Sequence, residues 1–207
     1  YTIEEVLERI KHAKRPVFYA GNGIRLSGGY EEFRRFVEQM QLPVVTGWDS
    51  IDLIEDTHPL YVGRGGIMGD RAGNFAVQNA DLILAVGNRL SIRQVGYNWK
   101  SWAREAYVIM VDIDPAELKK TTLHVELADA CEFLAAMNRK EAELCREEEK
   151  KVMEQEKVLK KQMAWRSRCA EWKQKYPVTT ERQWKEDGRY ANVYAFVRYL
   201  SSSLPES

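Results

Sequence analysis

The chain has 207 residues, of which 44% are hydrophobic and 30% are charged. This profile is typical of a soluble globular protein with a sizeable core and disfavours a disordered or membrane-spanning one. Lysine plus arginine equals aspartate plus glutamate at 31 each, so the charge balance gives no reason to expect nucleic acid or a membrane surface as a partner. We therefore expect a cytoplasmic protein.

The three cysteines, Cys131, Cys145 and Cys169, are widely spaced and form no C-x-x-C pair. This spacing disfavours a zinc site and a disulfide framework, and predicts unpaired thiols. The sequence begins with Tyr1 rather than methionine. That start favours an excised fragment of a longer protein.

The first predicted elements alternate between helix and strand. Residues 3–10 place apolar side chains at the spacing of an amphipathic helix, and Thr2 precedes them as an N-cap. The run VFYA at 17–20 predicts a strand, residues 29–41 a second helix, and 42–46 a short buried strand. This order is that of a βα nucleotide-binding unit.

Two further apolar runs, at 81–87 and 106–114, show no polar alternation. Parallel strands that are covered on both faces have this pattern. Alternating strands and helices with such runs predict an α/β fold with right-handed crossovers. We therefore interpret residues 1–137 as one open, doubly wound parallel α/β domain, whose ligands would lie at the carboxyl ends of the strands.

Beyond residue 137 the composition changes. Residues 138–176 are rich in charge and free of glycine and proline, which predicts one or two long solvated helices packed along a neighbour rather than a coiled coil. Their expected apolar stripe is narrow and consists of Val152, Leu159 and Met163. Residues 177–188 read as a connector and 192–204 as a short final helix. The region 138–207 is thus predicted to be a helical extension that leads to a further module.

The turn Gly21-Asn22-Gly23 follows the first predicted strand, where a dinucleotide-binding loop would lie. A G-x-G-x-x-G fingerprint needs a third glycine at position 26, which is Leu26. No Gly-Lys-Ser/Thr follows either, so a P-loop is excluded. The turn either holds a nucleotide in a non-standard way or only reverses the chain.

Three other glycine-containing or acidic loops are expected at the same edge, at 63–71, 87–91 and 111–118. Backbone amides at such turns suit phosphate oxygens, and Arg64, Arg71 and Arg89 could supply the matching charge. Asp112 ends a strand, where a carboxylate can accept hydrogen bonds from ribose hydroxyls. Each loop is equally explained as a plain turn, and Asp114 before Pro115 as a helix N-cap.

Other side chains give little sign of catalysis. The histidines are scattered, and no serine lies in an elbow motif. The aromatic residues between 97 and 107 are expected to be packing or interface anchors; they are Tyr97, Trp99, Trp102 and Tyr107.

Taken together, three stretches carry a family resemblance: PVFYAGNGIRLSGG at 16–29, the run 42–91 with HPL, GRGGIMG and ADLILAVGNRLS, and VIMVDIDPAELKK at 108–120. In this order they resemble the middle domain of thiamine-diphosphate-dependent enzymes of the acetolactate synthase type. The resemblance implies an open, doubly wound six-stranded parallel sheet, Rossmann-like and of the DHS-like NAD/FAD-binding type. It also implies that this domain does not perform the chemistry.

Some members of that family hold FAD or ADP on this domain, and many hold nothing. Carried onto this chain, the resemblance implies a cofactor site made of Gly21, Gly23, Gly66, Gly69, Arg89 and Asp112. Flavin-holding members are similar to G-x-R-F-D-D-R after the third strand, whereas this chain reads Gly87-Asn88-Arg89-Leu90-Ser91. Both aspartates are missing, so we expect a vestigial site without its flavin.

The family's thiamine diphosphate and Mg²⁺ motif runs from Gly-Asp-Gly to Asn-Asn, and the sequence contains neither string. The resemblance therefore implies a non-catalytic fragment of an enzyme that makes or breaks a carbon–carbon bond of a 2-oxo acid, with thiamine diphosphate and Mg²⁺ in the parent. Its partners would be the amino- and carboxyl-terminal thiamine-binding modules, in a homo-oligomer. The alternative is a stand-alone protein that binds FAD, ADP or NAD.

Overall fold

The computed structural model describes residues 2–119, 124–147, 152–185 and 190–204. Its centre is a six-stranded sheet in which every neighbouring pair is parallel, in the order β3-β2-β1-β4-β5-β6. The strands are β1 (Pro16–Ala20), β2 (Val44–Thr46), β3 (Tyr61–Arg64), β4 (Leu82–Val86), β5 (Tyr107–Asp112) and β6 (His124–Leu127). The strand order reverses between β1 and β4, which confirms the doubly wound α/β prediction.

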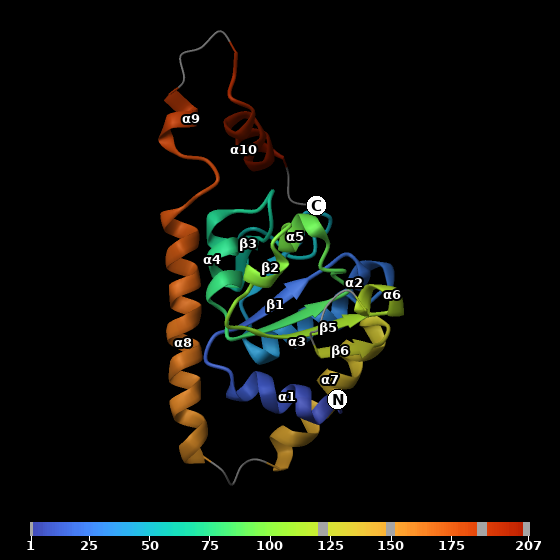
Figure 1. Cartoon of the computed structure of the whole chain (residues 1–207). Helices are drawn as coiled ribbons and strands as arrows, with labels where there is room; N and C mark the ends of the chain where they lie inside the picture. The colour runs from blue at the N-terminus through green and yellow to red at the C-terminus, as the bar shows by residue number, and fades with distance from the viewer. Residues whose placement is uncertain (1, 120–123, 148–151, 186–189, 205–207) are drawn as a thin grey trace.

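Helices cover both faces of the sheet (Figure 1). One face packs against α1 (Ile3–His12), α3 (Tyr30–Met40) and α7 (Ala130–Glu147), and the other against α4 (Arg71–Asn79) and α8 (Val152–Lys175). β1 and β4 are buried along their whole length. This two-sided burial explains why their sequences are continuously apolar.

The remaining described helices lie in the loops between the strands and in the carboxyl-terminal region of the chain. They are α2 (Gly23–Leu26), α5 (Ile92–Val95), the 3₁₀ helix η1 (Trp99–Ser101), α6 (Pro115–Leu118), α9 (Glu181–Lys185) and α10 (Val193–Ser203). The predicted Thr2 cap of α1 is present as a capping box with Glu5. Within the described ranges, no helix combines the length and apolarity that crossing a bilayer requires.

The helix α8 lies along α4 and the sheet edge at β3 (Figure 1). The prediction that Leu159 and Met163 belong to its buried apolar face is wrong, because both side chains are exposed. The side chain of Val152 lies outside the described residues. The buried face instead carries Trp165 and Cys169. Packing against α4 and the sheet buries this face, which carries the aromatic side chain of Trp165.

Candidate functional site

The predicted ligand crevice lies at the carboxyl ends of β1 and β4, where the strand order reverses. In this structure the two loops there are hydrogen-bonded to each other: Gly21 N donates to Val86 O at 3.0 Å, and Gly23 N donates to Gly87 O at 2.9 Å. These are two of the backbone amides that a phosphate would need. Both are directed at the neighbouring strand and loop.

Close backbone approach explains the glycines of this turn. A Cβ atom at Gly21 would lie 2.2 Å from the Gly87 carbonyl oxygen, and one at Gly23 would lie 2.7 Å from the Gly87 Cα. Asn88 adds a side-chain bridge, since its buried amide nitrogen lies 3.4 and 3.3 Å from the carbonyl oxygens of Tyr19 and Ala20. The loops of β1 and β4 are therefore joined across the crevice.

The third loop, between β3 and α4, is held by the helix that follows it. Asn74 accepts from Gly66 N at 2.8 Å and donates to Gly66 O at 3.0 Å, so both backbone groups of this glycine are occupied. Gly69 N donates to Gly66 O, and a Cβ at Gly69 would lie 2.5 Å from the Arg64 carbonyl oxygen. The loop closes on itself rather than presenting a ring of free amides.

Two of the three arginines that could face a phosphate form ion pairs within the chain. Arg64 makes a two-pronged contact with Asp70, Nη2 to Oδ1 at 2.7 Å and Nε to Oδ2 at 3.2 Å, and these hydrogen bonds raise the pKa of the Arg64 guanidinium. Arg89 Nε donates to Glu117 Oε1 at 2.9 Å, and the Glu117 side chain is largely buried. The third, Arg71, lies over the ring of Tyr176.

Asp112 ends β5, as predicted, but its carboxylate binds the backbone of the following turn: Oδ1 accepts a hydrogen bond from Asp114 N at 3.0 Å. Asp114 in turn accepts from Ala116 N and caps α6, with Pro115 in its first turn. The predicted N-cap is therefore confirmed. The structure places all six predicted cofactor-site residues at the same sheet edge, each held by or packed against other protein groups.

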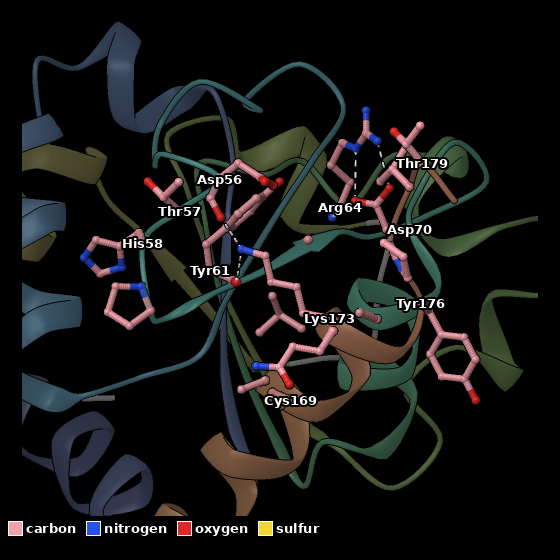
Figure 2. A pocket seen from close by; sticks show the side chains of 18 of the residues that line it. Asp56, Thr57, His58, Tyr61, Arg64, Asp70, Cys169, Lys173, Tyr176 and Thr179 are labelled. Atoms are coloured by element: carbon pink, nitrogen blue, oxygen red, sulfur yellow. Dashed lines mark hydrogen bonds and ion pairs between the residues drawn. The ribbon is translucent and has the colours of Figure 1, made fainter. Parts of the chain in front are cut away.

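A groove of about 990 Å³ lies elsewhere, between β3, α8 and α10. None of the six predicted residues lines it. Figure 2 shows Lys173 at its centre, where the ammonium group donates to the carbonyl oxygens of Asp56 and Tyr61. Burial lowers the pKa of Lys173, while Asp56 and Asp70 act to raise it.

Sequence reasoning missed the residues that close the predicted site: Asp70, Asn74, Asn88 and Glu117. Asn88 stands at an unrestricted position of the family pattern, and its bridge to β1 spans more than 65 positions. Glu117 lies 28 positions from Arg89, whereas Asp70 and Asn74 bind residues six and eight positions away, within the loop after β3 and the start of α4. In the described residues, no group of three histidine, cysteine, aspartate or glutamate side chains could hold a metal ion.

Comparison with known proteins agrees with this geometry. The family model described as "Thiamine pyrophosphate enzyme, central domain" matches residues 3–137. The chain is 38% identical to a probable acetolactate synthase large subunit from Methanococcus aeolicus, over 57% of this chain and 20% of the relative. It is 36% identical to the acetolactate synthase large subunit of Corynebacterium glutamicum, over 65% of this chain and 22% of the relative.

A chloroplastic acetolactate synthase from Zea mays is 39% identical over 66% of this chain and 21% of the relative. The match thus spans about a fifth of the length of these curated relatives. The parallel sheet, its crevice between β1 and β4 and the matched residues lead to one conclusion: the chain belongs to the thiamine pyrophosphate enzyme family, as a central domain.

Proposed function

We propose that the chain is the non-catalytic middle domain of a thiamine-diphosphate-dependent enzyme, similar to acetolactate synthase, that makes or breaks a carbon–carbon bond of a 2-oxo acid. The observation that carries the proposal is the family match over residues 3–137, joined to a carboxyl edge whose polar groups bind one another. Thiamine diphosphate would supply carbanion stabilisation in the parent protein. This domain would space and buttress the modules that bind it.

The six predicted cofactor-site residues serve the fold in this proposal. Phosphate oxygens would compete with Val86 O and Gly87 O for the amides of Gly21 and Gly23, and with Glu117 for Arg89. Breaking several such contacts costs about 1 kcal/mol or more each, which a ligand would have to repay. FAD and ADP are therefore not expected to bind, and the stand-alone nucleotide-binding alternative is disfavoured.

The test uses the purified chain. We expect no flavin absorption band and a change in melting temperature below about 1 °C with FAD, ADP or NAD at 1 mM, because a ligand of the folded state must raise it by mass action. A flavin band, or a clear shift with one nucleotide, would contradict the closed site. Arg89→Ala and Asp112→Ala would then show which groups bind.

The parent protein is tested by its gene. The 118 residues matched in the archaeal relative make up 20% of it, so it has about 590 residues. We expect an open reading frame of similar length around this chain, encoding the two thiamine-binding modules. A homo-oligomer and a cytoplasmic location complete the proposal and rest on the resemblance and the composition. A reading frame limited to these 207 residues would refute the proposal of a longer parent protein.

A further inference from the structure

Large apolar side chains project from the carboxyl edge of the sheet, beside the hydrogen-bonded loops described above. Five of them are 49–71% exposed and follow β2, β3 and β4 in the chain. We call them the apolar crest: Trp48, Ile51, Ile67, Met68 and Ile92. Isolated exposed apolar residues are ordinary, but five from three adjacent loops form a surface that favours a partner.

The loops of the crest are fixed to one another. Ile67 N donates to the Arg93 carbonyl at 2.8 Å, and the Arg93 guanidinium lies 5.1 Å from the ring centroid of Trp48. A Cβ at Gly66 would lie 2.4 Å from the Arg93 carbonyl oxygen, so these loops touch backbone to backbone. The crest is therefore pre-organised, which lowers the entropy cost of covering it.

A second apolar surface lies on α10. Ala195 is its one buried hydrophobic residue, and the following are exposed: Val193, Tyr194, Phe196, Val197, Tyr199 and Leu200. The loop that begins at the crest with Ile51 reaches α10 at Asp56, whose carboxylate lies 4.0 Å from Arg198. A helix that is apolar on most sides is stable only against other protein.

We propose that the apolar crest and α10 form one docking surface for the module that follows α10 in the full-length polypeptide, an inference that rests on the proposed function. About four-fifths of each relative lies outside the matched region, so protein is present to cover it. Protein, not a nucleotide, occupies the edge where a doubly wound sheet usually binds its ligand.

Cysteine footprinting tests the surface. Met68→Cys places a thiol on the crest, and Met163→Cys places a matched thiol on the exposed side of α8. Each variant is made in the 207-residue chain and in the full-length protein, and its labelling rate with a maleimide is read by peptide mass spectrometry. We expect Met68→Cys to react at least ten-fold more slowly in the full-length protein, and Met163→Cys to react equally in both.

Other outcomes overturn the proposal in distinguishable ways. Equal labelling of Met68→Cys in both proteins leaves the crest uncovered. Protection in the 207-residue chain that grows with concentration assigns the crest to a second copy, and protection on adding FAD assigns it to a nucleotide. A gene that ends with this chain refutes both the proposed function and the docking proposal, whereas equal labelling refutes the docking proposal alone.

A second pair of variants reports on stability. Ile67→Asp should lower the melting temperature of the full-length protein by several degrees and leave that of the 207-residue chain within about 1 °C, because its side chain is covered only in the former. Leu159→Asp, on the exposed side of α8, should change neither. Equal effects of Ile67→Asp in both proteins would mean that it acts on the folding of this domain.

Discussion

Gly66 illustrates how single residues build this edge. Its φ of 100° is one that side chains rarely adopt, and its Cα faces the Arg93 carbonyl so closely that a Cβ would lie 2.4 Å away. Gly96 also has a positive φ, of 76°, but open space surrounds the position of its missing Cβ. A side chain at Gly66 would therefore cause both backbone strain and a steric clash, whereas one at Gly96 would cause backbone strain alone.

Gly66→Ala should lower the free energy of unfolding by about 3 kcal/mol, and Gly96→Ala by about 1 kcal/mol, because strain acts at both positions and the clash only at the first. Urea unfolding of the two variants measures the difference. Equal losses would show that the loop after β3 can move away from α5 without cost.

Cys169 gives stability a pH dependence. Burial raises the pKa of its thiol from 9.0 to about 12. Between these values the unfolded chain has lost the thiol proton while the folded chain keeps it, so this group's contribution is complete below pH 9 and is lost as the pH rises towards 12. The loss approaches about 1.4 kcal/mol per pH unit.

Cys169→Ala should therefore flatten the decline in unfolding free energy between pH 9 and 10.5, although the variant is less stable at neutral pH because it leaves a cavity. Urea titrations at several pH values in this window measure both slopes. Parallel profiles for the two proteins would mean that the thiol ionises equally in the folded and unfolded states.

Among the elements, α8 is fixed by polar contacts to several carbonyl groups. Trp165 Nε1 donates to Pro16 O at 3.0 Å, and Gln162 Nε2 donates to Ala13 O at 2.9 Å, beyond the end of α1. Trp165 also packs edge-on against Trp172. The helix beyond the family match is therefore part of the core that covers one face of the sheet.

Trp165→Ala should lower the free energy of unfolding by about 3–5 kcal/mol, since it removes a buried aromatic side chain and a hydrogen bond. The substitution should also accelerate maleimide labelling of Cys169, which is buried beside Trp165 on the same helix. Trp184→Ala, at a half-exposed position on α9, is the control and should change neither value. A native labelling rate in the first variant would show that α8 docks without this anchor.

At the scale of the whole molecule, the sequence predicts the strands that are buried on both faces. β1, β4 and β5 are recognised because both faces are covered and their residues are apolar, apart from Asp112 at the end of β5. β3 contains a glycine and an arginine, and β6 has four residues that include a histidine and a glutamate. Their local patterns carry no strand signal, so only the family resemblance predicted six strands.

The candidate site was less predictable than the fold. Sequence placed Gly21, Gly66 and Arg89 at the right edge, because loop positions follow from strand order. It could not show that Asn88 joins β4 to β1 or that Glu117 pairs with Arg89, since these contacts depend on how distant loops meet. A glycine needed for close packing looks the same in sequence as one that receives a phosphate.

The contact between Lys173 and the carbonyl of Tyr61 has a consequence for self-association. β3 is an outer strand, and an uncovered outer strand offers unpaired backbone groups to strands of other molecules. The ammonium group occupies one of these carbonyls, and α8 lies along the strand. A fragment cut at residue 137, where the family match ends, would lose this cover and acquire a site for intermolecular β-pairing and aggregation.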